Sequence, residues 1–313
     1  MIRPDDFFHP EMKPILNARR LMPPAETPEE RKKAWIVYTK AISPAVPESF
    51  KVVNRTIPAG DVDVPVRIYY PPTASEDPGC IVYMHGGGWM LGNLDSSETQ
   101  AWGISLGTGA VLVSVDYRLC PEFPFPAAFD DCYGVFEWLS RNGAEIGVDP
   151  ERIAVCGESA GGNLTAALAL AARDRNGPVM RAQGIVYPAT GEKTDLPSYI
   201  EYKDGPALTT ERQIYYNHVY YLDGGHGENP YAAPAMARDF SNLPPAFVHT
   251  AECDPLRDDG RYYAAKLAMA GNQVIYREAK RMLHGFLRSW NDGPAVRAEY
   301  DALCGFLKEH LDA

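Results

Sequence analysis

The sequence lacks cysteines at the spacings that bind metal ions or cross-link small secreted domains. Its 313 residues include six cysteines, and none forms a CxxC pair or joins histidines in a zinc-ligand pattern. Several lie within apolar runs, where cysteine behaves as a small hydrophobic residue. We therefore expect free thiols in a reducing compartment and no zinc site.

Clustered positive charge and long apolar runs are also missing. Thirty Lys and Arg residues stand against 41 Asp and Glu residues, a formal net charge of −11. Because phosphate contacts need clustered positive charge, we expect no nucleic-acid partner. No apolar run approaches the roughly 20 residues of a membrane-spanning helix, and residues 1–20 contain no apolar core of a secretory signal. These absences predict a cytoplasmic protein without a membrane partner.

From residue 80 onward, short apolar runs alternate with helical stretches. The apolar runs, rich in β-branched residues, cover 80–85, 110–117, 152–156, 182–188, 246–251 and 273–279. The helical stretches include 129–142, 160–174, 257–272 and 295–311. Near-continuous apolarity is typical of strands buried on both faces, so the pattern predicts an α/β fold with a mostly parallel sheet between two helical layers. Two β-rich runs within 50–71 predict an antiparallel hairpin at one edge of the sheet.

Two regions break this alternation. Residues 1–48 carry amphipathic stretches at 12–20 and 29–41 but no strand signal, and residues 189–240 separate two strands by far more than a usual connection. Within the second region, a helix is predicted from Thr209 to the glycine pair 224–225. We expect four parts: N-terminal helices (1–48), a first core part (49–188), an insertion (189–240) and a second core part (241–313).

A candidate nucleophile follows the apolar run 152–156. Residues 157–161 read GESAG, which fits the pattern G-x-S-x-G, and a helix rich in small residues leaves it directly. This strand–turn–helix context is that of a nucleophile elbow, in which a turn too tight for flanking side chains requires Gly157 and Gly161. The turn would raise the hydroxyl of Ser159 above the sheet, at the positive end of a helix.

A glycine-rich loop, HGGGW at 85–89, follows the apolar run 80–85. Consecutive glycines allow close approach of the backbone to a ligand, and acyl transfer needs fixed N–H donors for the developing oxyanion. We predict the N–H groups of Gly87, Gly88 and Ala160 as these donors. His85 is expected to shape the loop by hydrogen bonding, because a base should follow the acid in chain order.

A nucleophilic serine needs a histidine base and a carboxylate that orients it. In α/β folds with a nucleophile elbow, these three residues follow one another along the chain in the order serine, acid, histidine. This order favours His284, which lies in a loop shortly after the last predicted strand. Asp254 is the favoured acid because it directly follows a strand; Asp258 is the second choice and Asp259 a further rival, both at a helix start. The other histidines after the serine have simpler explanations in a strand, a terminal helix or the insertion: His218, His226, His249 and His310.

Taken together, these motifs resemble the hormone-sensitive-lipase-like family of serine esterases, within the α/β-hydrolase fold. The matching blocks stand in the family's order over residues 80–290: HGGGW (85–89), DYRLCPEFPFPAAFDD (116–131), GESAGGNL (157–164), DPLRDDG (254–260) and HGF (284–286). Two departures concern Glu158, where Asp is commoner, and Cys120 with Phe123, where Ala and His are commoner. Because Glu158 keeps the carboxylate, we expect the same supporting role beside the serine.

The resemblance implies a carboxylic-ester hydrolase acting on short- to medium-chain acyl esters, with a helical cap formed by 1–48 and 189–240. It implies Ser159 as nucleophile, Asp254 as acid and His284 as base. It also implies a small-molecule ester as the partner, and neither a metal nor an organic cofactor. Members are often dimers, which suggests a homodimer, although no residue identifies an interface. The expected pocket lies between cap and sheet and is lined by aromatic residues such as Phe7, Phe8, Trp89, Tyr215 and Tyr216, although each of them fits the packed core of the cap at least as well. An amide or formamide hydrolase with the same triad, and a non-catalytic ligand receptor, are the alternatives; the presence of His284 argues against the receptor.

Overall fold

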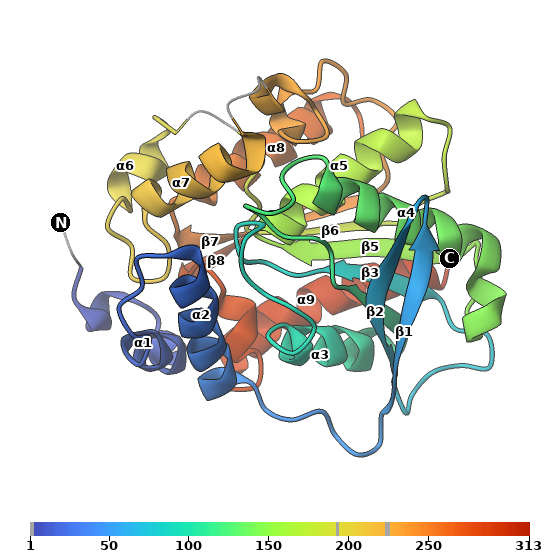
Figure 1. The fold of residues 1–313 in the computed structure, drawn as a ribbon, viewed down its shortest axis with the longest axis horizontal. Helices are drawn as coiled ribbons and strands as arrows, with labels where there is room; N and C mark the ends of the chain where they lie inside the picture. The colour runs from blue at the N-terminus through green and yellow to red at the C-terminus, as the bar shows by residue number, and fades with distance from the viewer. Residues whose placement is uncertain (1–2, 192–193, 223–225) are drawn as a thin grey trace.

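A mixed sheet of eight strands forms the centre of the molecule (Figure 1). The computed structural model describes residues 3–191, 194–222 and 226–313. The strands are β1 (Lys51–Ala59), β2 (Val62–Tyr70), β3 (Cys80–Met84), β4 (Val111–Val115), β5 (Ile153–Glu158), β6 (Gln183–Val186), β7 (Ala246–Cys253) and β8 (Val274–Leu283). Their order across the sheet is β1-β2-β4-β3-β5-β6-β7-β8.

The strand directions agree with the sequence pattern. β1 pairs with β2 and β2 with β4 in antiparallel register, whereas all pairs from β4 through β8 are parallel. The predicted hairpin therefore lies at one edge, as expected. In β2, Val64, Val66 and Ile68 are buried while Asp63 and Pro65 are exposed, because alternate side chains of a strand point to opposite faces. The α/β fold class predicted from the sequence is confirmed.

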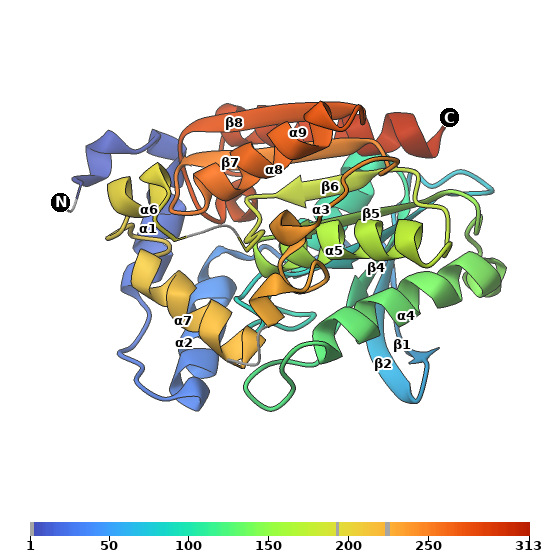
Figure 2. The same cartoon turned by 90° about the horizontal axis from the view of Figure 1, so that it is seen from above.

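Helices cover both faces of the sheet (Figures 1 and 2). One face carries α4 (Ala127–Asn142), α5 (Ala160–Asp174) and α8 (Arg257–Met269); the other carries α3 (Glu98–Thr108) and α9 (Pro294–Leu311). Helix α3 is absent from the predicted helices. Most of its residues are buried, so its sequence has no polar face and no amphipathic period to detect.

A third group of helices lies beside the carboxyl ends of the central strands: α1 (Lys13–Arg20), α2 (Pro28–Ile42), α6 (Pro197–Glu201) and α7 (Thr210–Tyr221). The first two coincide with the amphipathic stretches of the N-terminal region. Helix α7 begins where predicted, with the side chain of Thr209 accepting a hydrogen bond from the Arg212 N–H. The predicted end of this helix, Gly224–Gly225, lies outside the described residues.

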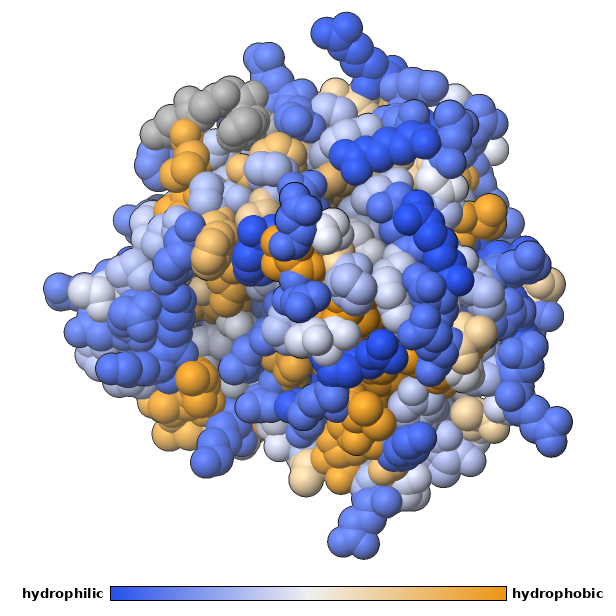
Figure 3. All heavy atoms as spheres, turned by 45° about the vertical axis from the view of Figure 1, so that its right-hand side comes forward, coloured by the Kyte–Doolittle hydropathy of each residue, from blue (hydrophilic) through white to orange (hydrophobic). Residues whose placement is uncertain are grey.

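Figure 3 shows one face of the molecule, on which hydrophilic side chains dominate and hydrophobic residues form small separate groups. Within the described ranges of the chain, no helix is both long and apolar enough to cross a membrane. The apolar side chains are instead gathered in one core between the sheet and its helices.

Candidate active site

Ser159 lies in a sharp turn between β5 and α5. Its backbone has φ 57° and ψ −115°, a region that non-glycine residues rarely adopt. A Cβ atom added at Gly157 would lie 2.3 Å from the carbonyl oxygen of Gly161, and one at Gly161 would lie 2.0 Å from that of Met84. Both flanking positions therefore require glycine, and the turn places the serine hydroxyl at the first residue of α5, Ala160.

The hydroxyl of Ser159 is hydrogen-bonded to His284, which in turn is hydrogen-bonded to Asp254. The Ser159 Oγ lies 2.9 Å from His284 Nε2, and His284 Nδ1 lies 2.6 Å from Asp254 Oδ2. Asp254 directly follows β7 and is fully buried, and His284 directly follows β8. With the Nδ1–H donated to a carboxylate, Nε2 is left as the acceptor for the serine proton, which is the tautomer that base catalysis needs.

The rival carboxylates have other partners. Asp258 forms an ion pair with Arg257 at 3.0 Å, and Asp259 accepts the backbone N–H of Thr190 at 3.0 Å. Asp258 also accepts the backbone N–H of Ser198 at 2.9 Å, so both carboxylates link the start of α8 to Thr190 and Ser198. The fold thus brings Asp254, and neither of its neighbours, to the imidazole.

The other buried histidines also have partners away from the serine. His249, inside β7, lies 3.0 Å from Glu299, and burial lowers its pKa. His85 lies 3.0 Å from the carbonyl oxygen of Gly86 and stacks on Tyr117, whose hydroxyl donates to the His85 carbonyl oxygen at 2.6 Å. Burial lowers the pKa of His85 to about 4. A neutral His85 therefore shapes the glycine loop, as the chain order suggested.

The glycine loop lies against the serine turn. Gly87 and Gly88 have positive φ angles, 138° and 60°, and a Cβ atom at Gly88 would lie 2.4 Å from the ring of Tyr216. Within the described part of the chain, neither N–H group donates to a protein acceptor, and the N–H of Ala160 opens a helix and has no intrahelical partner. These three groups are available to an oxyanion beside Ser159.

An unpredicted residue, Arg288, links the serine turn to the histidine loop. It lies in the short 3₁₀ helix Phe286–Ser289 and forms an almost fully buried ion pair with Glu158 at 2.6 Å. Glu158 also accepts hydrogen bonds from Gln100 at 3.0 Å and from the hydroxyl of Tyr187. The supporting role expected for Glu158 is thus explained by contacts, whereas a single arginine four positions after His284 gave no signal in the sequence.

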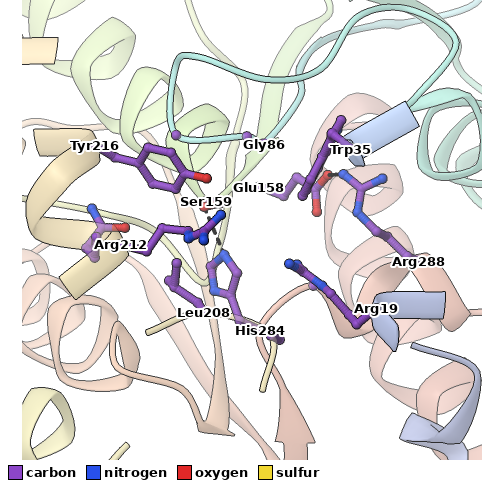
Figure 4. A pocket seen from close by; sticks show the side chains of 15 residues that line it. Arg19, Trp35, Gly86, Glu158, Ser159, Leu208, Arg212, Tyr216, His284 and Arg288 are labelled. Atoms are coloured by element: carbon purple, nitrogen blue, oxygen red, sulfur yellow. Dashed lines mark hydrogen bonds and ion pairs between the residues drawn. The ribbon is translucent and has the colours of Figure 1, made fainter. Parts of the chain in front are cut away.

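A pocket opens above Ser159 between the sheet and the helices α1, α2 and α7 (Figure 4). The space directly at the serine is narrow, about 30 Å³. An outer cavity of about 290 Å³ adjoins it. The two spaces share the lining residues Arg19, Trp35, Ala207, Leu208, Arg212 and Tyr216.

Of the aromatic residues expected at the pocket, only Tyr216 is among its described lining residues. Trp89 is fully buried and stacks on Tyr220 with ring centres 4.1 Å apart, because it occupies a turn with positive φ that directs its ring beneath α7. Tyr215 is adjacent to Tyr216 on α7, and adjacent residues of a helix point about 100° apart. The ring of Tyr215 therefore points in another direction and packs under the guanidinium of Arg31. Phe7 and Phe8 pack against each other near the N-terminus. The structure therefore corrects the expected placement of Trp89, Tyr215, Phe7 and Phe8.

Within residues 3–191, 194–222 and 226–313, no group of three or more His, Cys, Asp or Glu side chains could hold a metal ion.

The chain is similar in sequence and in structure to known esterases. The family model described as the α/β-hydrolase fold matches residues 81–288, which include Ser159, Asp254 and His284. Carboxylesterase NlhH of Mycobacterium tuberculosis is 40% identical over 291 residues, covering 91% of this chain and 90% of that protein. An arylesterase of Saccharolobus solfataricus is 38% identical over 252 residues, 80% of each chain. The crystal structure of a thermostable esterase from Pseudomonas putida ECU1011 has a TM-score of 0.91 at 32% identity, covering 97% of this chain and 98% of that one.

Proposed function

Because the chain belongs to the hormone-sensitive-lipase-like family of the α/β-hydrolase fold and is a carboxylesterase, we propose that it cleaves small esters with Ser159, His284 and Asp254. The observation that carries this assignment is the continuous hydrogen-bond chain from Asp254 through His284 to the hydroxyl of Ser159 at the bottom of a pocket. A small-molecule ester is the substrate.

The proposed reaction has two halves. In the first, His284 Nε2 takes the proton of Ser159 Oγ as the oxygen attacks the ester carbonyl, and the oxyanion is held by the N–H groups of Gly87, Gly88 and Ala160. The imidazolium, stabilised by Asp254, then protonates the leaving alcohol, and the acyl group stays on the serine. In the second half, His284 deprotonates a water molecule that attacks the acyl-enzyme, and the acid is released with the serine regenerated.

We further propose that residues 1–48 and 189–240 form a cap over a core made of 49–188 and 241–313. Support comes from the pocket, because Arg19 and Trp35 from the first region and Leu208 and Tyr216 from the second line the space above the serine. The narrow space at the serine supports a preference for short- to medium-chain acyl groups. Tyr216 is the proposed substrate contact, whereas Trp89 and Tyr215 pack elsewhere.

Two further proposals concern the oligomeric state of the protein and its cellular compartment. The edge strand β8 ends the sheet and exposes Ile275 and Tyr276, which supports a homodimer formed along this edge. All six cysteines are buried and unpaired, which supports a reducing compartment such as the cytoplasm. Light scattering coupled to size-exclusion chromatography measures the assembly directly, and a monomeric mass would contradict the homodimer.

The experiment that tests the reaction is hydrolysis of p-nitrophenyl esters from acetyl to palmitoyl by the wild type and by Ser159→Ala. We expect turnover to peak at short or medium chains and kcat to fall in the variant by a factor of about 10⁶, as for loss of a triad nucleophile. More than a trace of activity in folded Ser159→Ala would refute the nucleophile assignment. No turnover of any ester by the folded wild type would favour a narrow amide hydrolase or a ligand receptor instead.

A further inference from the structure

The charge of the pocket is opposite to that of the whole chain. The chain has a formal net charge of −11. By contrast, the two adjoining spaces above the serine are lined by four arginines, Arg19, Arg31, Arg212 and Arg288, and by one carboxylate, that of Glu158. An acidic protein that collects cations around its nucleophile has a local potential suited to an anionic ligand.

Among the residues that the structure describes, only one of these arginines is neutralised by a carboxylate. Arg288 is paired with Glu158 and also donates to the carbonyl oxygen of Ser96 at 2.7 Å. Among the described residues, no carboxylate forms an ion pair with Arg19 or Arg212, although both side chains are half-buried. Some arginines outside the pocket, such as Arg297 with Asp301, do have acidic partners.

Arg19 is held in place without a counter-ion. Its guanidinium lies 4.3 Å from the ring centre of Tyr38 and 5.5 Å from that of Trp35. Its Nε atom is buried and has no hydrogen-bond partner within the described part of the chain. The aromatic rings thus fix the direction of the side chain and leave its donors unused.

Arg212 faces Arg19 across the pocket. Figure 4 shows the two side chains entering the pocket from opposite sides, Arg212 from α7 and Arg19 from α1, with Ser159 and His284 close to the tip of the Arg212 side chain. Both arginines line the narrow inner space and the outer cavity. A group bound between them would therefore belong to the same molecule whose ester lies at the serine.

Two guanidinium groups in a partly dehydrated pocket match a planar carboxylate, which each can bind through paired N–H donors. A neutral substrate would bury these charges without compensation, which is unfavourable. We infer that the preferred substrate is an ester that also carries a free carboxylate, and that Arg19 and Arg212 bind this carboxylate. This inference rests on the proposed ester hydrolysis and names the substrate class for the same site.

The test compares two matched pairs of esters, in each of which one member carries a carboxylate and the other a neutral group at the same position. The acyl-side pair is the p-nitrophenyl monoester of adipic acid and p-nitrophenyl hexanoate; the alcohol-side pair is 4-acetoxybenzoate and 4-acetoxybenzamide. Ser159→Ala supplies the background rate for each ester. We expect kcat/KM of the anionic member to exceed that of its neutral partner at least about tenfold in one pair, because hydrogen bonds to charged groups are stronger than those between neutral groups. The pair that shows the preference identifies the side of the ester that carries the carboxylate.

The variant that tests the residues is Arg19→Gln with Arg212→Gln. We expect its ratio of anionic to neutral kcat/KM to fall about 10- to 100-fold, mainly through KM, and the wild-type ratio to fall between about 0.05 M and 0.5 M salt because the charges are screened. Arg20→Gln is the matched control: it lies next to Arg19 on α1, pairs with Asp5 at the surface and should leave the ratio unchanged.

The outcomes separate this inference from the proposed function. Turnover of neutral esters without preference for the anionic member of either pair would overturn the inference and leave ester hydrolysis standing. A wild-type preference that persists in the double variant would overturn the role of Arg19 and Arg212. No turnover of any of the four esters would instead remove the proposed function on which the inference rests.

Discussion

The floor of the pocket, formed by the ends of the central strands, and its roof, formed by α1 and α7, differ in whether their charged side chains have partners of opposite charge. The floor comes from the ends of the central strands, and there each buried charge has a partner: Glu158 with Arg288, and Asp254 with His284. The roof comes from α1 and α7, and its cations Arg19 and Arg212 have no acidic partner among the described residues. Buried charges in a floor must be compensated before any ligand arrives. Half-exposed charges in a roof can keep water as their partner until a ligand replaces it.

The most severe way to disturb the floor is to remove the charge that orients the base. Asp254→Asn should lower kcat by about 10⁴, because the amide favours the wrong imidazole tautomer. Steady-state kinetics with p-nitrophenyl acetate measures this loss. Asp258→Asn is the matched control, since its carboxylate binds Arg257 and the N–H of Ser198. Near-normal turnover in Asp254→Asn, together with a large loss in Asp258→Asn, would reassign the acid.

A second disturbance breaks the pairing of the floor without touching the reacting groups. Glu158→Gln leaves Arg288 buried without a counter-ion and should lower the free energy of unfolding by about 3–5 kcal/mol. Urea unfolding at neutral pH measures the change. Glu158→Asp, which keeps the charge, should lose less.

The exposed ion pair between Arg297 and Asp301 is the reference for the loss of stability in Glu158→Gln. Breaking such an exposed pair changes the free energy of unfolding by about 1 kcal/mol or less. A loss in Glu158→Gln as small as in Arg297→Gln would show that the floor tolerates an unpaired charge. The floor would then not differ from the roof in its need for paired charges.

The smallest expected effect comes from the neutral histidine of the floor. The pKa of His85 is lowered by burial to about 4, whereas the unfolded chain has a value of about 6.5. As pH falls from about 6.5 to 4 the unfolded state takes up a proton that the folded state excludes, so stability decreases over this window, by about 3 kcal/mol in full. In His85→Asn, whose amide can replace Nδ1–H toward Gly86, unfolding free energy should fall less between pH 7 and pH 4.5. An identical decline in both proteins would assign the acid sensitivity to other groups.

Much of the core could be predicted because its signals are local. The elbow around Ser159 is visible as a strand, two glycines and a helix in direct succession, and the chain order of Asp254 and His284 follows from the fold. Helix α3 was missed because burial on most sides removes the polar face that reveals a helix. The aromatic pocket residues were partly wrong because hydrophobic character does not tell which way a side chain points: Tyr216 faces the pocket, whereas Tyr215 and Trp89 pack against Arg31 and Tyr220.

The proposed reaction chemistry follows from the order of residues along the chain, because the proposed nucleophile, the proposed base and the glycine loop stand in short motifs with strict backbone requirements. The arrangement of charge around them depends on the fold. Arg288 reaches Glu158 across 130 positions of the chain, and Arg19 and Arg212 line the same pocket although they belong to α1 and α7. A formal net charge is a sum over the whole chain, whereas a substrate responds to the few charges within reach of its own atoms, and these are brought together by folding.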